Sequence, residues 1–554
     1  MFENKLPLPI GVDFYKEAVN EYFTIDKTLM IKDVIDAQTK VSLFTRPRRF
    51  GKTLNMDMLR VFFEKTSDDN SVYFKDKLIW QQGEKYTKEC GRYPVIWLTF
   101  KDAKYNSWND TMDGLSYLFA NEFSRHNELL SQTLTNNDRL LYENVTNRCA
   151  SIADLQSSLA FLSEKLAKAC GEPAIIIIDE YDTVIQKGYT SGFYDEAVSF
   201  MRNLFSGAFK NNPYLKYGFM TGILRISKES IFSGLNNLVV YSVLTDEFSQ
   251  YFGFTKDDIR TLTKYYECED KFDEICDWYD GYRFGNTEIF NPWSVISYIK
   301  FKCKTDIYWS NTSSNDVIYE LLERADNVTL KSLQALYERK TVSSVVNIST
   351  TYLNLKSSLS EILSFLLVTG YLKVTGSSIE DDETVYDFAI PNREIKTVYK
   401  DEILKRAADF SDMPSLAYEI SDALRKKNVY QFEKLVKHFL TTSVSYYDCT
   451  ESFYHGLMLG LLAFTGEYYN VKSNREAGYG RFDIALFPLK EGYPGYVFEF
   501  KVAKSVLLLD LKANEALKQI NDREYTLELK NACVKDIVKV GMAFKGKRAV
   551  IKSR

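Results

Sequence analysis

Short apolar runs alternate with longer amphipathic stretches over about the first 230 residues. Four of these runs are rich in β-branched and aromatic residues and predict strands: VSLFT at 41–45, PVIWLTF at 94–100, AIIIID at 174–179 and YGFMTG at 217–222. After the first of them, LNMDMLRVFFEK spaces its apolar side chains as a helix does. The alternation predicts a parallel sheet with crossover helices, which holds its ligands at the carboxyl ends of the strands.

The pattern changes after residue 250 and divides the rest of the chain into three regions. Residues 251–300 are helical with frequent turns and predict a lid on the first domain, residues 1–250. Residues 301–409 contain a helix, a strand, an acidic turn and another strand, which suits a helical, winged-helix-like region. Such elements often contact DNA, but many only pack against protein. Residues 410–554 predict helices, three strands (EYYNVKS, RFDIALFP and GYVFEFKV) and a helix through ALKQI, so the fold class is α/β.

Composition narrows the classes of function. The 554 residues carry a net charge of -5, so any contact with nucleic acid needs a local basic surface. The three histidines are too few for a histidine-rich metal site, and none of the eight cysteines forms a C-x-x-C pair. The N-terminus lacks the pattern of a signal peptide, and no run reaches the roughly 18 to 20 apolar residues that span a bilayer. These features favour a cytoplasmic protein with no membrane partner.

The segment TRPRRFGKTLNM, residues 45–56, joins the first strand to its helix. Its end matches the last three positions of the phosphate-binding motif G-x-x-x-x-G-K-[ST] with Gly51, Lys52 and Thr53. Gly51 lets the backbone approach phosphate, Lys52 reaches the β and γ oxygens, and Thr53 can hold Mg²⁺. Arg46, however, stands where the first glycine belongs. The end of the segment therefore predicts a nucleotide site, and its beginning does not follow the motif.

The changed start of the loop leaves two interpretations open. Pro47 has no N–H to offer to phosphate, but the guanidinium groups of Arg48 and Arg49 could replace the lost contacts. With Arg46 in the loop itself, all three arginines are candidates for nucleotide binding. The alternative is a basic loop ahead of an ordinary helix.

Polar residues at the ends of later strands favour the nucleotide site. Asp179 would bind Mg²⁺ through water, and Glu180 would orient or deprotonate the attacking water. Thr221 could sense the γ-phosphate, and Arg225 could stabilise the transferred charge, although a strand-end cap and a surface charge are the open alternatives. Asp102 is a weaker candidate. The arrangement fits a P-loop NTPase of the additional-strand type.

Six separated segments resemble, in order, a bacterial AAA-ATPase-like family whose loop reads RPRRFGK[ST]. They are YFTIDKTLMIKDVI, LFTRPRRFGKTLNMDML, IIIIDEYD, TGILRISKESIFSGLNN, YFGFTKDDI, and WYDGYRFG followed by IFNPWSVI. The resemblance covers about residues 5–300. It implies that the arginine-bearing loop is this family's own form and that the chain binds ATP with Mg²⁺. It does not establish fast hydrolysis.

A second set of carboxylates lies in GRFDIALFPLKEGYPGYVFEFKV. Asp483 falls on one predicted strand, and strand alternation puts Glu499 and Lys501 on one side of the next. If the KEGYPG turn joins neighbouring strands, Asp483 can meet Glu499. The two carboxylates would then hold one or two Mg²⁺ ions against a scissile phosphate, while Lys501 positions water or steadies charge. The alternative is a hairpin with a solvated, charged face.

This D-x15-E-x-K pattern resembles the PD-(D/E)XK nuclease superfamily, specifically the nuclease-like domain that accompanies the ATPase family. The resemblance covers about residues 410–540. It adds three second-tier candidates: His455 on a helix expected to abut the metal site, Glu476 before the Asp483 strand, and Gln519 on the last helix, where it could contact substrate. His455 could equally be a packed residue. Phe482 replaces the proline that gives the superfamily its name, as happens in many members.

Two functions follow from these patterns. The first is an ATPase coupled to a Mg²⁺-dependent nuclease that acts on DNA or RNA. The second is a nucleotide-dependent switch or interaction protein whose nuclease-like domain binds without cleaving. The complete carboxylate sets favour the first, whereas the unusual loop and the acidic net charge favour the second. The sequence leaves open the choice between DNA and RNA and the assembly into a homo-oligomer.

Overall fold

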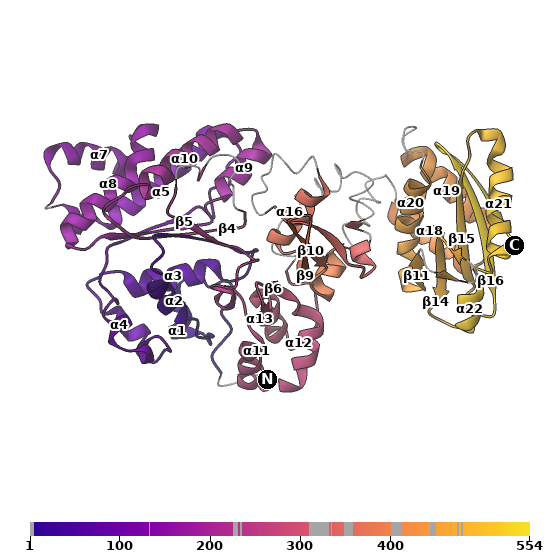
Figure 1. The fold of residues 1–554 in the computed structure, drawn as a ribbon, viewed down its shortest axis with the longest axis horizontal. Coiled ribbons are helices and arrows are strands. Elements are labelled where there is room, and N and C mark those ends of the chain that lie inside the picture. The colour runs from indigo at the N-terminus through magenta and orange to yellow at the C-terminus, as the bar shows by residue number, and fades with distance from the viewer. Residues whose placement is uncertain are drawn as a thin grey trace. The chain divides into compact units, whose positions relative to one another are not determined.

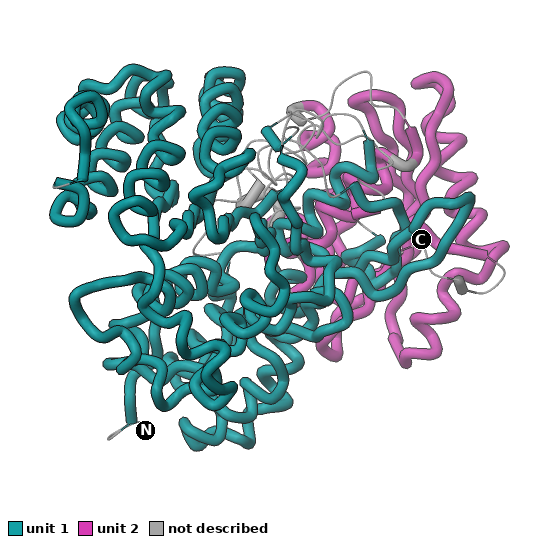
Figure 2. The backbone as a smooth tube through the Cα atoms, turned by 60° about the vertical axis from the view of Figure 1, so that its left-hand side comes forward, with its two compact units in different colours: residues 1–315, 335–397 teal, residues 316–334, 398–554 magenta. Residues whose placement is uncertain are grey.

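The structure is a computed structural model of the chain. It describes residues 5–131, 133–224, 231–232, 235–309, 332–333, 335–347, 358–399, 413–443, 450–473, 476–477 and 480–554. The chain divides into two compact units, residues 1–315 with 335–397 and residues 316–334 with 398–554 (Figure 2). The finer division at residues 250, 300 and 409 stays a prediction.

The first unit is built on a parallel five-stranded sheet in the order β2-β3-β4-β1-β5. The strands are β1 Val41–Thr45, β2 Val95–Thr99, β3 Ala174–Asp179, β4 Leu215–Gly222 and β5 Leu238–Tyr241. The first four confirm the predicted strands, and β5 was not predicted. β4 lies between β1, which leads into the nucleotide loop, and β3, which ends in Asp179. It is therefore the additional strand of the predicted NTPase type.

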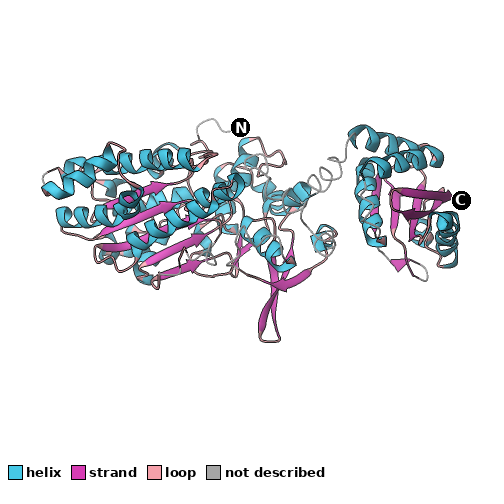
Figure 3. Cartoon of the chain, turned by 90° about the horizontal axis from the view of Figure 1, so that it is seen from above, coloured by secondary structure: helices cyan, strands magenta, loops and turns pink. Residues whose placement is uncertain are grey.

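Helices cover both faces of this sheet, as the ribbon views show (Figures 1 and 3). In Figure 1, α3 lies on one face and α5, α8 and α10 lie on the other. The helices of this part are α1 Tyr15–Glu21, α2 Leu29–Ala37, α3 Lys52–Phe63, α4 Glu84–Thr87, α5 Trp108–Arg125, α6 Asn127–Leu130, α7 Asn136–Thr146, α8 Ile152–Cys170, α9 Thr183–Ser191 and α10 Tyr194–Phe209. All five residues of β1 and all six of β3 are buried, as expected for strands covered on both faces.

The rest of the first unit comprises the predicted lid and part of the middle region. The lid contains α11 Lys256–Tyr265, α12 Phe272–Tyr279, the hairpin β6 Tyr282–Phe284 and β7 Thr287–Ile289, and α13 Pro292–Lys300. The middle region contains β8 Val342–Val345, α16 Leu359–Thr369, β9 Lys373–Glu380 and β10 Glu383–Ala389. β10 pairs antiparallel with both β8 and β9. α16 precedes the β9–β10 hairpin, which agrees with the predicted order of a helix, a strand, an acidic turn and a strand.

A buried carboxyl group ties the middle region to the lid. Glu394 is 0% exposed. Its Oε1 accepts the N–H groups of Tyr308 and Trp309 at 2.7 and 2.8 Å, and its Oε2 accepts the Ser294 hydroxyl at 2.8 Å. Burial raises the pKa of Glu394 to about 7, although these three donors act in the opposite direction. Glu394 therefore connects three separate segments of the first unit.

The second unit is a mixed sheet with helices on both faces (Figure 1). The strand order is β11-β14-β15-β16-β17, and only the β15–β16 pair is parallel. Its elements are α18 Met413–Arg425, α19 Val429–Ser443, α20 Glu451–Ala463, β11 Tyr469–Ser473, β12 Glu476–Ala477, β13 Gly480–Arg481, β14 Ile484–Pro488, β15 Gly495–Val502, α21 Leu509–Asp522, α22 Leu527–Asn531, β16 Ile537–Lys545 and β17 Arg548–Ser553. The three predicted strands are present, and two further strands, β16 and β17, extend the sheet beyond the final predicted helix.

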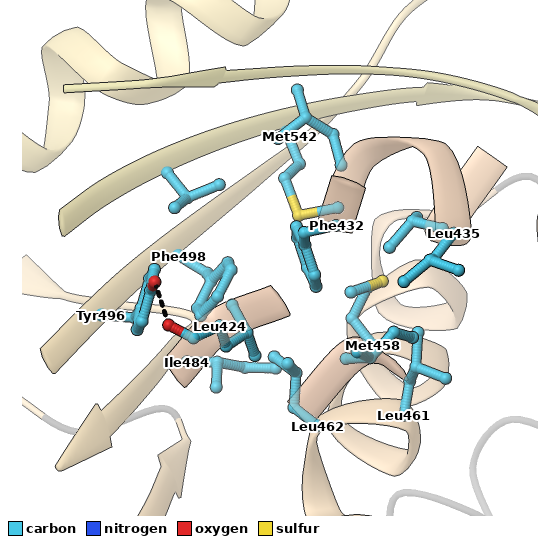
Figure 4. Packing of buried hydrophobic residues seen from close by; sticks show 14 of the residues in the cluster. Leu424, Phe432, Leu435, Met458, Leu461, Leu462, Ile484, Tyr496, Phe498 and Met542 are labelled. Atoms are coloured by element: carbon cyan, nitrogen blue, oxygen red, sulfur yellow. Dashed lines mark hydrogen bonds between the residues drawn. The ribbon is translucent and has the colours of Figure 1, made fainter. Parts of the chain in front are cut away.

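The core of the second unit lies between this sheet and helices α18 to α20 (Figure 4). Phe432 and Met458 from the helices meet Phe498 and Met542 from the strands. The Tyr496 hydroxyl donates to the Leu424 carbonyl at 2.7 Å, which satisfies a buried polar group inside this apolar layer. This packing fixes β14 and β15 side by side. Within the described residues of both units, no helix is long and apolar enough to cross a membrane.

The pKa of Glu394 predicts a pH dependence of unfolding in the first unit. Because the folded-state pKa is above the ordinary 4.5, Glu394 contributes stability that is fully present below about pH 4.5 and is lost as the pH rises to about 7. The contribution amounts to about 3 kcal/mol at most. In Glu394→Gln, which cannot titrate, we expect this component to disappear. Urea unfolding of both proteins at pH 5 to 8 tests this expectation, and parallel stability curves for the two would contradict it.

Candidate nucleotide and nuclease sites

The loop between β1 and α3 has the geometry of a phosphate-binding loop at its helix end. Gly51 caps α3 with φ of 75°, a left-handed conformation that glycine adopts without strain. Lys52, the first residue of the helix, turns back so that its Nζ donates to the carbonyls of Arg46 and Pro47 at 3.1 and 3.0 Å. Burial lowers the pKa of Lys52, while the nearby charge of Glu180 opposes that shift. The ammonium group thus lies inside the curve of the loop.

Asp179 accepts hydroxyl groups from the start of α3 and from the ends of β2 and β4. The Thr53 hydroxyl donates to its Oδ2 at 2.8 Å and the Thr99 hydroxyl to the same oxygen at 3.3 Å. The Thr221 hydroxyl donates to its Oδ1. Asp179 is 0% exposed, and its pKa is raised by burial and by the charge of Glu180. A cation at this position would stabilise the ionised carboxylate, so the oxygens of Asp179 and Thr53 fit a hard divalent ion.

Glu180 is held in an unusual backbone conformation at the end of β3. Its φ is 53°, and its N–H donates to the Thr221 hydroxyl at 3.1 Å. Thr221 therefore fixes both carboxylate residues, because one hydroxyl group serves Asp179 and Glu180. A residue in the left-handed region at a strand end is a strained position of the kind that is found at functional sites. Asp102 lies exposed in the turn after β2, and Arg225 falls outside the described residues.

Arg46 points away from the position that was predicted for it. Its side chain is 0% exposed and lies over the rings of Phe252 and Phe284, with its Cζ at 5.3 and 5.0 Å from their centroids. Its Nη1 donates to the carbonyls of Thr45 and Tyr241 at 3.0 and 2.8 Å. Burial lowers its pKa to about 9. The guanidinium group is thus committed to the interior, and its assignment as a phosphate contact is corrected to a support of the loop.

The other two arginines differ from Arg46 in exposure. Arg48 is half-buried and donates to Gln186 Oε1 at 3.1 Å. Arg49 is exposed, has φ of 69°, and lies over the ring of Trp293 with its Cζ 4.2 Å from the centroid. Both stay candidates for contact with nucleotide.

One buried carboxylate near this site was missed by the sequence analysis. Asp182 is 3% exposed, and its Oδ2 accepts the N–H groups of Ile223 and Leu224 at 2.8 and 3.0 Å. It thereby shapes the segment that follows β4 and Thr221. The signal was the third acidic residue of IIIIDEYD, which a strand pattern alone does not assign to any contact.

The predicted meeting of Asp483 and Glu499 follows from strand register. Ile484 of β14 pairs with Phe498 of β15, so Asp483 comes opposite Glu499 one residue further along. Asp483 Oδ2 accepts the N–H of Phe500 at 2.6 Å. Glu499 Oε1 accepts from Lys501 Nζ at 3.0 Å and from Gln519 Nε2. Four residues from two strands and α21 are therefore gathered at one place.

One carboxylate oxygen at this place has no partner, although Lys501 is paired with the other oxygen of the same group. Glu499 is 3% exposed, and its buried Oε2 has no hydrogen-bond partner. Burial and then the charge of Asp483 raise the pKa of Glu499 to about 7, and burial also raises the pKa of Asp483. The charge of Glu499 raises the pKa of Lys501 against the effect of burial. An orphaned carboxylate oxygen beside a second carboxylate fits a divalent cation that would bind both.

The second-tier residues are placed around this pair. His455 Nε2 lies 3.0 Å from both the Asp483 carbonyl and the Ser473 hydroxyl, so it holds the backbone of Asp483. Gln519 links Glu499 to the Tyr525 hydroxyl, which is 3.2 Å from its Nε2. Glu476 lies in β12, with its backbone paired to Arg481, and its side chain is outside the described part of the structure.

The sequence analysis also missed an acidic residue beside the carboxylate pair. Glu451, exposed in the first turn of α20, raises the pKa values of both Asp483 and Glu499 by its charge. Across the described residues, no three His, Cys, Asp or Glu side chains are arranged to hold a metal ion together. Glu451 is thus within electrostatic range of the pair. The signal was weak because a lone Glu at a helix start is usually a cap.

The position of Arg46 generates a prediction about stability. Arg46→Met keeps the length of the side chain but removes the donor to the buried Tyr241 carbonyl, so we expect the nucleotide-free first unit to lose about 1–3 kcal/mol of unfolding free energy. Arg48→Met is the matched control and is expected to change stability by less than about 0.5 kcal/mol. Chemical denaturation measures both. Equal stability of the two variants would mean that Arg46 does not support the loop.

Comparison with known proteins confirms the two predicted family resemblances. Residues 9–232 match the model of a predicted AAA-ATPase family, and residues 449–554 match that of the PD-(D/E)XK nuclease superfamily. An uncharacterized protein in the vnfD 5' region of Azotobacter chroococcum mcd 1 is 24% identical over 538 residues, which are 94% of this chain and 92% of that protein. That similarity also runs through the middle region, which neither family model covers. The chain therefore carries an AAA-ATPase-like domain over residues 9–232 and a PD-(D/E)XK nuclease superfamily domain over residues 449–554.

Proposed function

We propose that this protein is an ATPase coupled to a Mg²⁺-dependent nuclease that acts on DNA or RNA. The observation that carries the proposal is the carboxylate pair of the second unit, in which the buried Glu499 Oε2 has no hydrogen-bond partner beside Asp483. Strand register brings these two acidic side chains together, and the free oxygen leaves room for a cation as its partner.

In the proposed ATPase reaction, each polar residue of the first unit has one task. Lys52 leaves the loop carbonyls and binds the β and γ oxygens of ATP. Thr53 and Asp179 hold Mg²⁺, which when bound neutralises charge on those oxygens. Glu180, fixed through its N–H by Thr221, takes the proton of the attacking water. Thr221 lies near the end of β4, between β1 and β3 in the sheet. Because it is hydrogen-bonded to both Asp179 and Glu180, its position depends on the protonation and metal binding of these two residues.

In the proposed nuclease reaction, Asp483 and Glu499 hold the cation. Bound there, Mg²⁺ would polarise the scissile phosphate and acidify its bound water. Lys501 releases Glu499 and stabilises the negative charge that develops on the phosphate. Gln519, bridging Glu499 and Tyr525, orients the free oxygen of Glu499 toward the cation. His455 keeps the Asp483 backbone in place.

The hairpin of the middle region is a poor candidate for the nucleic-acid contact. Its tip, Glu380-Asp381-Asp382-Glu383, is exposed and carries four negative charges. Inserted into a groove, these side chains would face phosphates of the same sign. We propose that the middle region contacts protein instead.

The second candidate function is a nucleotide-dependent switch whose C-terminal domain binds nucleic acid without cleaving it. It is favoured by the side chains of the nucleotide loop, which contact residues of the lid and middle region, as in the stacking of Arg49 on Trp293. The two functions share the ATP site and differ in whether nucleic acid is cleaved at the Asp483 and Glu499 site.

The ATP site is tested by two variants with opposite expected effects. Lys52→Ala removes the only lysine of the loop, so we expect ATP binding to be lost. Glu180→Gln keeps the shape of the site but cannot accept a proton, so binding persists while turnover falls about 10²- to 10⁴-fold. Calorimetry with Mg·ATP and a phosphate-release assay measure the two quantities. Unchanged affinity in Lys52→Ala would exclude the loop as the nucleotide site.

The carboxylate pair is tested by Asp483→Asn and Glu499→Gln. Each change leaves the cation with too few charged ligands, so we expect each to abolish Mg²⁺-dependent cleavage of labelled DNA and RNA while ATP turnover continues. The double variant should be no worse than either single one, because both disable the same unit. Lys501→Met should keep Mg²⁺ binding and lose rate. A parent protein that cuts no nucleic acid with any divalent metal, with or without ATP, would favour the switch.

A further inference from the structure

The nucleotide loop is unusual because its side chains contact the part of the chain that follows the ATPase sheet. Four of the five residues from Arg46 to Phe50 make such a side-chain contact, and Arg48 makes its contact through its backbone carbonyl. Arg46 lies over Phe252 and Phe284, Pro47 meets Gly370, the Arg48 carbonyl faces Trp309, Arg49 lies over Trp293, and Phe50 packs on Tyr282 and Phe284. A glycine-rich loop could make none of the side-chain contacts in this series.

Gly370 shows how closely the middle region approaches the loop. It ends α16 with φ of 92°, and a Cβ built at this position would lie 3.0 Å from Pro47 Cβ. Any other residue would be strained by its backbone and would also press on Pro47. The chain therefore brings the end of α16 into direct contact with the start of the nucleotide loop.

Trp309 makes the second contact and is held from three sides. Its Nε1 points at the Arg48 carbonyl at 3.5 Å, the limit of hydrogen bonding. Its ring meets Tyr371 edge to face, with centroids 4.8 Å apart and planes at 74°. Its own N–H donates to the buried Glu394. Trp309 is 2% exposed, so a shift of the loop must be accommodated by Trp309 or by its supports.

Binding of ATP has to disturb this arrangement. Lys52 Nζ now donates to the carbonyls of Arg46 and Pro47, and it must leave them to reach phosphate. Arg46 and Pro47 lose these hydrogen bonds, and Pro47 also contacts Gly370. The nucleotide and the residues that follow the sheet therefore both act on the segment Arg46-Pro47-Arg48.

We propose that Trp309, supported by Glu394, is a positioning residue of the nucleotide loop, through which the ATP site and the middle region, residues 335–397, are energetically coupled. The inference rests on the proposed binding of ATP at this loop. The coupling is reciprocal. The factor by which docking of the middle region on the loop changes the affinity for ATP equals the factor by which bound ATP changes the equilibrium constant of that docking. The loop would then bind the phosphates of ATP and also transmit the bound state to the middle region through its contacts with that region.

The test compares Trp309→Phe with wild type in the full chain. Phenylalanine keeps a ring against Tyr371 and removes the donor to Arg48, so we expect the Kd for Mg·ATP to rise about fivefold or more, with calorimetry as the measurement. We also expect ATP to change the tryptophan emission of wild type and most of that change to be absent in the variant. A purely structural role for Trp309 would lower stability without removing an ATP-dependent signal.

Trp108→Phe is the matched control. Trp108 begins α5, which lies on the face of the sheet opposite α3 (Figure 1), and it packs near Phe193 and Phe200, at centroid distances of 6.1 and 6.0 Å. Its replacement should leave both the Kd and the ATP-dependent change in emission as in wild type. An equal effect from both variants would overturn the assignment to Trp309.

A measurement on the unmodified chain covers the case in which Trp309→Phe does not fold. Hydrogen exchange of residues 358–397 should change on addition of Mg·ATP. If ATP binds but exchange and emission stay the same, the coupling is wrong and the proposed ATP site stands. If wild type does not bind ATP at all, the proposed function fails, and the coupling fails with it.

Discussion

The buried guanidinium group of Arg46 is the interaction on which the first unit depends. Burying a charged group away from water destabilises the folded state unless hydrogen bonds or other charges nearby compensate for the lost hydration. Here Nη1 donates to two carbonyl groups, from β1 and β5, and the group lies over the rings of Phe252 and Phe284, while the buried Nε and Nη2 have no hydrogen-bond partner. The shape of the nucleotide loop therefore depends on contacts with the edge strand and with the segments around these two rings. The conformation of this loop depends on side-chain contacts with distant segments of the chain, whereas the conformation of a glycine-rich loop depends mainly on its own backbone.

Three of the buried carboxyl groups, those of Asp179, Glu394 and Glu499, are stabilised in different ways. Asp179 is surrounded by hydroxyl groups from Thr53, Thr99 and Thr221. Glu394 accepts hydrogen bonds at both oxygens and acts as a structural joint. Glu499 keeps one buried oxygen without a partner. The unsatisfied group is the one that lies beside a second carboxylate, which is why it points to a cation and the satisfied Glu394 does not.

Local patterns in the sequence predict the elements that depend only on neighbouring residues. Four strands of the first sheet, the Gly51-Lys52-Thr53 helix start and the Asp179-Glu180 strand end all lie within short segments, so apolar runs and motif spacing predict them. The approach of Asp483 to Glu499 was predicted because a short turn joins two strands and alternation sets the face of each side chain. Strands β5, β16 and β17 were missed, although IVKVGMAF is a β-rich run.

Only the tertiary structure decided which residues meet across long separations. The sequence placed Arg46 at a phosphate position, but the direction of its side chain depends on Tyr241, Phe252 and Phe284, about 195 to 240 residues away. Likewise, Glu451 joins the electrostatics of Asp483 through the packing of α20 on the second sheet. The contacts of Trp309 and Glu394 follow no local period. Spacing along the chain determines secondary structure and neighbouring side chains, whereas burial and charge compensation arise only when distant segments pack together.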